Sequence, residues 1–123
     1  MPVGQKQEVK PQEARLDTNL ELRVGQSAAV TGETLSLTFD RVSSDSRCPV
    51  GVNCVWAGDA VLLFKVTGPK GDGTVDLHTQ QIGREATFQG FKIRLVTLVP
   101  NTTASEKIPV DRYAATLTIS KVK

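Results

Sequence analysis

Residues 91–95 have the sequence Phe-Lys-Ile-Arg-Leu, in which apolar and basic side chains alternate one by one. Successive side chains of a β-strand point to opposite faces, so this pattern predicts a strand with one buried and one wet face. One-sided burial is typical of antiparallel sheets, because parallel sheets are usually covered on both faces. The alternation breaks at Val96, Leu98 and Val99, and we expect that end to be covered on both faces.

The same period of two recurs along most of the chain. Turn residues separate the alternating segments at intervals of about 8 to 12 residues, which is typical of a sandwich or a small barrel. The sequence therefore predicts an all-β fold, an antiparallel β-sandwich of immunoglobulin-like or Greek-key type with about seven or eight strands. We expect the two long C-terminal strands to be central. The expected strands span residues 20–24, 28–30, 35–39, 60–66, 75–79, 86–88, 91–99 and 112–122.

Length and composition fit one globular domain. A chain of 123 residues can bury roughly two thirds of its unfolded surface. We expect a flexible leader over residues 1–18, which are polar and without period, and a single domain over residues 19–123. A net charge of +2 argues against a nucleic-acid partner, which requires a clustered basic face. No apolar run reaches the length of a transmembrane segment. The start has neither signal-peptide pattern nor lipobox cysteine, which fits either a cytosolic protein or a mature form without its signal peptide. The two cysteines favour the mature form, because a disulfide belongs to an oxidising compartment.

The two cysteines, Cys48 and Cys54, enclose a short segment that can double back. Pro49 fixes φ, and Gly51 can adopt the positive φ that a tight reversal needs. We expect a disulfide, which stabilises by about 2 to 2.5 kcal/mol in the chain-entropy model and belongs to an oxidising compartment. Two alternatives remain, namely two buried free thiols or a metal or redox site. The spacing is wider than that of redox pairs, and the single histidine lies far downstream.

The residues around the cysteines form a candidate binding loop. Asp45 has the sequence context of an Asx turn, and Arg47 could pair with Asp45 or with Asp59. The Asp45–Arg47 pair either pins its own loop or binds a ligand. Trp56 should project to the same side as Cys54, as a core residue or as an exposed binding platform. The candidate residues are Asp45, Arg47, Pro49, Trp56 and Asp59.

No established catalytic pattern is present in the sequence. His78 falls on the wet face of an expected strand, where a solvated histidine is the ordinary interpretation. The alternative is a hydrolase, which would need a carboxylate and a hydroxyl within reach of His78. Nucleophile elbow, phosphate-binding glycine loop and calcium loop are all missing. We therefore expect a non-enzyme with no catalytic residues, no metal and no cofactor.

The segment Asp45-Ser46-Arg47-Cys48-Pro49, with Cys54 and Trp56-Ala57-Gly58 behind it, resembles a known signature. It is that of an uncharacterised family of small exported bacterial proteins and lipoproteins. The resemblance extends to Leu98-Val99-Pro100 and to residues 113–117. It implies a bacterial β-domain that is secreted, periplasmic or at the cell surface, and it supplies no reaction or substrate.

A second resemblance is to immunoglobulin-like sandwiches. Tyr113, near the start of the last expected strand, is placed like the tyrosine corner of those domains. Cys48 and Cys54 are too close in sequence to form their inter-sheet disulfide. The likeness therefore concerns the architecture alone.

These observations predict an exported, non-enzymatic sandwich that binds a protein partner or small ligand, or serves the cell envelope. Residues 43–56 would make the contact. The alternative is a protease-inhibitor-like module that presents the loop 48–54, because a closed loop loses little conformational entropy on binding.

Overall fold

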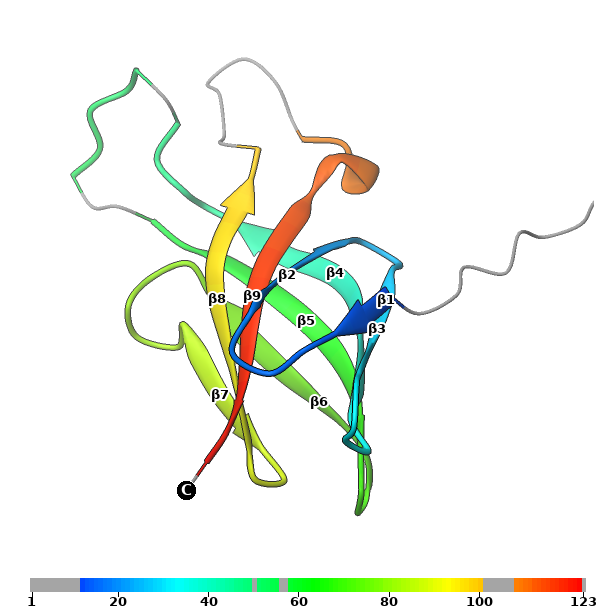
Figure 1. The fold of residues 1–123 in the computed structure, drawn as a ribbon. Helices are drawn as coiled ribbons and strands as arrows, with labels where there is room; N and C mark the ends of the chain where they lie inside the picture. The colour runs from blue at the N-terminus through cyan, green and yellow to red at the C-terminus, as the bar shows by residue number, and fades with distance from the viewer. Residues whose placement is uncertain (1–11, 50, 56–57, 101–107, 123) are drawn as a thin grey trace, which may run out of the picture.

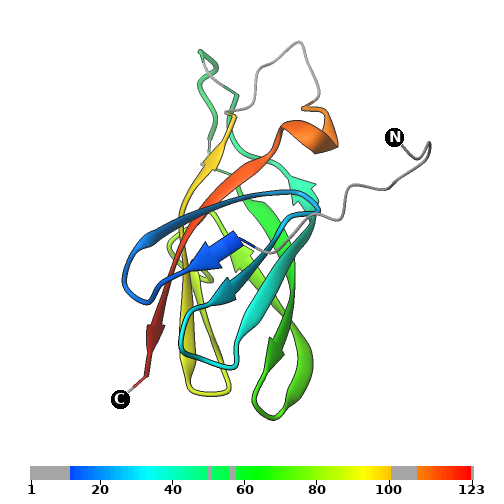
Figure 2. The ribbon, with the colours of Figure 1, turned by 45° about the vertical axis from the view of Figure 1, so that its right-hand side comes forward.

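The computed structural model describes residues 12–49, 51–55, 58–100 and 108–122 (Figure 1). In this part of the chain, two sheets pack face to face, and the predicted all-β sandwich is confirmed (Figure 2). One sheet has the order β1-β3-β4-β5-β6 and the other β2-β9-β8-β7. The elements are β1 (Gln12–Ala14), β2 (Asn19–Arg23), β3 (Ser27–Val30), β4 (Ser36–Asp45), β5 (Ala60–Gly68), β6 (Gly71–His78), β7 (Glu85–Phe88), β8 (Phe91–Val99), the 3₁₀ helix η1 (Val110–Arg112) and β9 (Ala114–Lys121).

The core lies between the two sheets and consists of the apolar positions of the alternating strands. Phe39 on β4 and Phe64 on β5 are completely buried, and their rings stack with centroids 4.8 Å apart. Each large apolar side chain buried in this way contributes roughly 1.5 to 3 kcal/mol to folding. The other large side chains that are almost fully buried are Leu22, Leu37, Leu62, Leu77, Ile93, Leu95, Leu117, Ile119 and Val66.

Strands β8 and β9 are central in their sheet, as predicted. The break in alternation near the end of β8 has a different cause from the one expected. Leu95 pairs with Leu117 and Thr97 with Thr116, so Val96 is an extra residue that forms a β-bulge. The bulge shifts the inward position to Leu98, which is buried, while Val99 is 47% exposed. Covering on both faces is therefore wrong for this end of the strand.

Residues 12–14 form β1, although the sequence predicted a leader up to residue 18. This strand pairs in parallel with β3, and Ala14 is buried in the core. Its sequence is Gln-Glu-Ala, which is too short and too polar to show a period. Asp17 N also donates a backbone hydrogen bond to Ile119 O of β9. Residues 1–11 of the expected leader lie outside the described residues.

Strand β4 continues beyond the predicted end at Phe39 as far as Asp45. Two register shifts against β5 interrupt its alternation, and the polar sequence 40–45 hides it from a pattern-based prediction. Strand β6 likewise begins at Gly71 rather than at the predicted Val75. The long β4 carries Asp45 to the end of the sandwich where η1 also lies (Figures 1 and 2). Among the described residues, no helix is long and apolar enough to cross a membrane.

Candidate functional site

The predicted disulfide between Cys48 and Cys54 is confirmed, with the two Cα atoms 5.9 Å apart. Gly51 has a φ of +83°, so it adopts the reversal conformation for which a glycine was expected. The bond excludes the alternatives of two free thiols and of a thiolate metal site. We call residues 46–59, which join β4 to β5 and contain the bond, the disulfide loop.

Asp45 ends β4 and makes a two-pronged ion pair with Arg47. Arg47 Nε donates to Asp45 Oδ1 at 2.8 Å, and Nη2 donates to Oδ2 at 2.7 Å. The backbone N–H of Arg47 also donates to Oδ1 at 3.3 Å, which is the contact of the predicted Asx turn. The side chains are only 11% and 13% exposed. Of the two partners considered for Arg47, the structure selects Asp45.

Arg47 and Asp45 also bind segments from the other sheet. Arg47 Nη1 donates to Leu98 O at 3.2 Å, and Nη2 donates to Pro100 O at 2.9 Å. The Tyr113 hydroxyl donates to Asp45 Oδ2 at 2.8 Å. We call Asp45, Arg47 and Tyr113 the Asp45 cluster. Tyr113 thus bonds a carboxylate, whereas the hydroxyl of a tyrosine corner bonds the backbone.

The Asp45 cluster keeps fixed protonation states over a wide pH range. Burial alone would raise the pKa of Asp45, but hydrogen bonds from Arg47 and Tyr113 and the charge of Arg47 outweigh it and hold the pKa below its usual range. The hydrogen bond to Asp45 raises the pKa of Arg47. Burial and the contact with Asp45 raise the pKa of Tyr113 to about 12. Near neutral pH the cluster therefore contains a charged Asp45–Arg47 pair and a neutral Tyr113 hydroxyl, and its hydrogen bonds tie the start of the disulfide loop to the other sheet.

The two limbs of the disulfide loop meet at Ser46, Gly58 and Asp59, which we call the loop base. Ser46 N and Oγ donate to Asp59 O at 2.7 and 2.9 Å, and Asp59 N donates to Ser46 Oγ at 3.1 Å. Gly58 has a φ of +71°, and a Cβ at this position would lie 1.9 Å from Ser46 O. The limbs approach so closely that only glycine fits at this position.

Asp59 also joins the loop base to the end of β6. Its Oδ2 lies 2.5 Å from His78 Nδ1, while Oδ1 accepts hydrogen bonds from the Thr79 hydroxyl and from Gln80 N. Burial would raise the pKa of Asp59, but the hydrogen bonds from His78 and Gln80 N and the His78 charge lower it. The sequence interpretation of His78 as merely solvated missed this pairing. The pairing follows from the β5–β6 register, which sets Val61 opposite His78 and leaves Asp59 just beyond it, and the sequence alone carries no signal for that register.

Among the described residues, the catalytic alternative for His78 has its carboxylate in Asp59, but no serine or threonine hydroxyl bonds His78. Thr79 donates to Asp59 rather than to His78. Within the described ranges, His78 Nε2 has no hydrogen-bond partner, and no three His, Cys, Asp or Glu side chains gather as metal ligands. The arrangement can orient the imidazole, and it lacks a positioned nucleophile in this part of the chain.

We call residues 48–55 the tip of the disulfide loop, and its described part exposes apolar side chains. Residues 48–58 carry no charged side chain. Val52 is 43% exposed and Val55 is 89% exposed. Pro49 is half-buried, and Trp56 lies outside the described residues. We call the Asp45 cluster and the loop base together the mounting of the disulfide loop, because they hold its two ends. Of the predicted site residues, Asp45, Arg47 and Asp59 belong to this mounting. Tyr113 and Gly58 also belong to it, and sequence reasoning did not identify them as parts of it.

A scan against protein-family models, a search of curated proteins and a search of solved structures each found no match for this chain. A functional proposal therefore rests on the geometry of the disulfide loop.

Proposed function

We propose that the protein is an exported, non-enzymatic β-sandwich module that binds a partner through the tip of the disulfide loop. The observation that carries the proposal is the contrast between the tip and its mounting. Val52 and Val55 expose apolar surface on an uncharged segment, while the Asp45 cluster and the loop base hold both limbs. A loop whose two limbs are already held in place loses less conformational entropy on association than a free loop does.

The signature residues support this interpretation, because most of them build the mounting. Asp45 and Arg47 form the ion pair, Ser46 bonds Asp59, and the cysteines close the loop. Gly58 permits the close approach of the limbs. The specified positions of the D-S-R-C-P-x4-C-x-W-A-G signature then hold the loop in place, and the side chains at its unspecified positions are presented to a partner.

The assignment to an exported protein rests on the disulfide. Such bonds are rarely maintained in a reducing cytosol, so the secreted, periplasmic and cell-surface compartments are favoured. The resemblance to small exported bacterial proteins points to the same compartments. A non-enzymatic role is favoured because the carboxylates of the candidate loop are committed to structural hydrogen bonds.

The experiment compares two equally exposed apolar positions. Val55 in the disulfide loop and Ile82, in the loop between β6 and β7, are each 89% exposed. Protein with Val55→Asp and protein with Ile82→Asp are immobilised beside wild type and incubated with an envelope extract of the source organism. We expect a specific partner to be retained by wild type and by Ile82→Asp and lost with Val55→Asp, at unchanged circular dichroism. Equal retention by all three proteins would refute the loop as the contact.

A protease-inhibitor-like module is the second candidate, favoured by one observation. A loop that contains proline is closed by a disulfide and tied at both limbs, which is the preorganisation that inhibitors exploit. The test is a panel of secreted serine, cysteine and metalloproteases, each assayed with the protein at about 10 µM. Loss of activity in one protease, relieved by Val55→Asp, would support this candidate. Full activity throughout the panel would eliminate it.

A further inference from the structure

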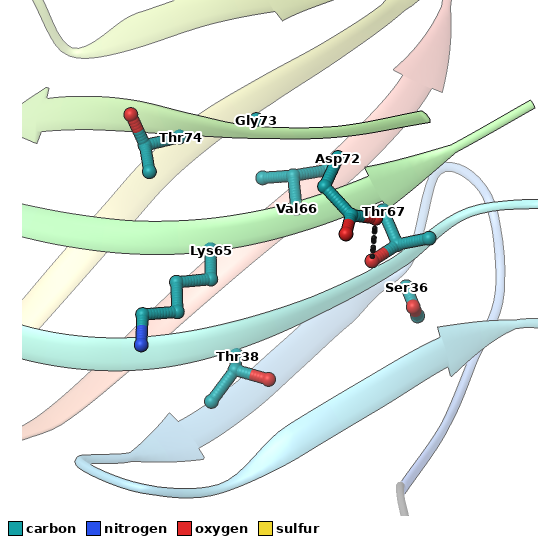
Figure 3. Close-up of a pocket in the computed structure, with 8 residues that line it drawn as sticks. All are labelled: Ser36, Thr38, Lys65, Val66, Thr67, Asp72, Gly73 and Thr74. Atoms are coloured by element: carbon teal, nitrogen blue, oxygen red, sulfur yellow. Dashed lines mark hydrogen bonds between the residues drawn. The ribbon is translucent and has the colours of Figure 1, made fainter. Parts of the chain in front are cut away.

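A hollow of about 460 Å³ lies on the outer face of the five-stranded sheet (Figure 3). It is formed near the start of β4, the β4 end that lies away from Asp45 and the disulfide loop. Its volume falls within the usual range of small-molecule sites. The polar side chains that line it are Ser36 and Thr38 from β4, Lys65 and Thr67 from β5, and Asp72 and Thr74 from β6.

The strand register arranges these six side chains in two rows across the sheet. Ser36 pairs with Thr67, and Thr67 pairs with Asp72. In the second row Thr38, Lys65 and Thr74 lie opposite one another in the same way. Cross-strand neighbours on one face are about 5 Å apart, and their shared face follows from the period of two. Five of the six side chains are short, which leaves the surface hollow.

Part of the hydrogen-bonding capacity of this hollow is used within the protein, since the Thr38 hydroxyl bonds the Ser27 hydroxyl at 2.6 Å, and part of it is free. The Thr67 hydroxyl donates to Asp72 Oδ1 at 2.9 Å, which leaves Oδ2 as an acceptor. Among the described residues, the hydroxyls of Ser36 and Thr74 have no protein partner. Lys65 is directed away from Asp72 in Figure 3, with Nζ 3.7 Å from an Asp40 carboxylate oxygen. The hollow therefore offers donors and acceptors side by side.

The charges and side-chain types select among ligand classes. The lining residues carry one carboxylate, Asp72, and one ammonium, Lys65, so the hollow has no excess of positive charge to attract an anion such as a phosphate. A metal ion is disfavoured because no three carboxylate, histidine or cysteine side chains gather in the described part of the chain. An apolar ligand would leave the hydroxyls and the carboxylate without partners, which costs free energy.

We propose that this hollow binds a neutral polyhydroxylated molecule, of the sugar and polyol class. Each hydroxyl of such a ligand both donates and accepts, as the threonine and serine hydroxyls do, and the free oxygen of Asp72 accepts from a ligand hydroxyl. The threonine methyl groups contact ligand C–H groups. Because none of the lining residues is aromatic, affinity comes from hydrogen bonds without ring stacking, and we expect a Kd on the order of 1 mM.

The test is a ¹H–¹⁵N NMR titration of the full chain with glucose, N-acetylglucosamine, trehalose and glycerol, and separately with inorganic phosphate. We expect saturable shifts of the amides of Thr38, Lys65, Thr67, Asp72 and Thr74 with at least one of the four neutral compounds, and none with phosphate. The isosteric double variant Thr67→Val/Thr74→Val should weaken that binding about ten-fold, since two hydrogen bonds are lost.

The matched control is Thr87→Val, on the exposed face of β7 in the other sheet, which should bind as wild type does. Saturable shifts confined to these strands and weakened only in the double variant support the proposal. It is overturned by an absence of saturable shifts with all four compounds. It is equally overturned by shifts only with phosphate or by unchanged binding of the double variant.

Discussion

The hydroxyl of Tyr113 donates a 2.8 Å hydrogen bond to the carboxylate of Asp45, and this contact joins the two sheets of the sandwich. Asp45 ends β4 of the five-stranded sheet, whereas Tyr113 directly precedes β9 of the four-stranded sheet. Arg47 reinforces the joint by donating to carbonyl oxygens of Leu98 and Pro100. The disulfide loop therefore emerges from a point where both sheets are tied together.

The Asp45 cluster predicts a graded loss of stability. Tyr113→Phe removes one hydrogen bond and keeps the ring, so we expect the free energy of unfolding to fall by about 1 kcal/mol. Asp45→Ala removes the carboxylate that pairs with the Arg47 guanidinium, which is 13% exposed, and that accepts from Tyr113, and we expect a loss of about 3 kcal/mol. Urea denaturation followed by circular dichroism measures both. Equal losses in the two variants would contradict the assigned role of the ion pair.

Stability should decrease in acid because two carboxyl groups have lowered pKa values. For Asp45 and Asp59 the folded pKa lies below the unfolded value, which is about 3.9. Their contribution is therefore fully present above that value and is lost as the pH falls through the folded pKa. Urea midpoints from pH 6 down to about pH 2 measure the slope. In Asp45→Asn/Asp59→Asn we expect a flatter slope than in wild type, and an identical slope would contradict the prediction.

Stability should also decrease in strong alkali, through Tyr113. An unfolded tyrosine ionises near pH 10, whereas burial and Asp45 raise the pKa of Tyr113 to about 12. The raised value stabilises the fold fully below pH 10, and this contribution is lost between about pH 10 and pH 12. Tyr113 is the single tyrosine of the chain, so tyrosinate absorbance reports it alone. Ionisation of the folded protein near pH 10 would contradict the prediction.

The loop base predicts a steric effect at Gly58. In Gly58→Ala the new Cβ would lie 1.9 Å from Ser46 O, in a backbone conformation that side chains rarely adopt. We expect a loss of about 3 kcal/mol or more in urea denaturation, from strain and clash together. Gly25→Ala is the matched control, because Gly25 has a φ of +89° and nothing within 4 Å of its Cβ position. It should lose about 1 kcal/mol from backbone strain alone, and an equal loss in both variants would show that the limbs can separate.

The parts of the fold that could be predicted are those with a local cause. The alternation of residues 91–95 depends only on which face each side chain occupies, so strand β8 was predicted with its bounds. The disulfide was predicted because Pro49 and Gly51, which favour a chain reversal, lie between the two cysteines. The bulge at Val96 could not be predicted, since it depends on the partner strand β9. Strand β1 could not be predicted either, because its three residues show no apolar alternation. The strand is held by its backbone pairing with β3.

The candidate site was predicted only where its contacts are close in sequence. The Asx turn of Asp45 and Arg47 spans two residues, whereas Tyr113 and Asp45 are 68 residues apart. The Asp59–His78 contact depends on the β5–β6 register, which the two sequences alone do not specify. Long-range partners of this kind follow from the packed sandwich rather than from any local motif.

The separation of tip from mounting in the disulfide loop makes the fold a natural scaffold for peptide display. The hydrogen bonds that close the loop base join Ser46 to Asp59, and the described positions between the two cysteines take no part in them. A foreign sequence grafted between Cys48 and Cys54 would be held at both ends by the Asp45 cluster and the loop base, as the native segment is. Natural variation could use the same freedom to change what is recognised while the framework stays constant.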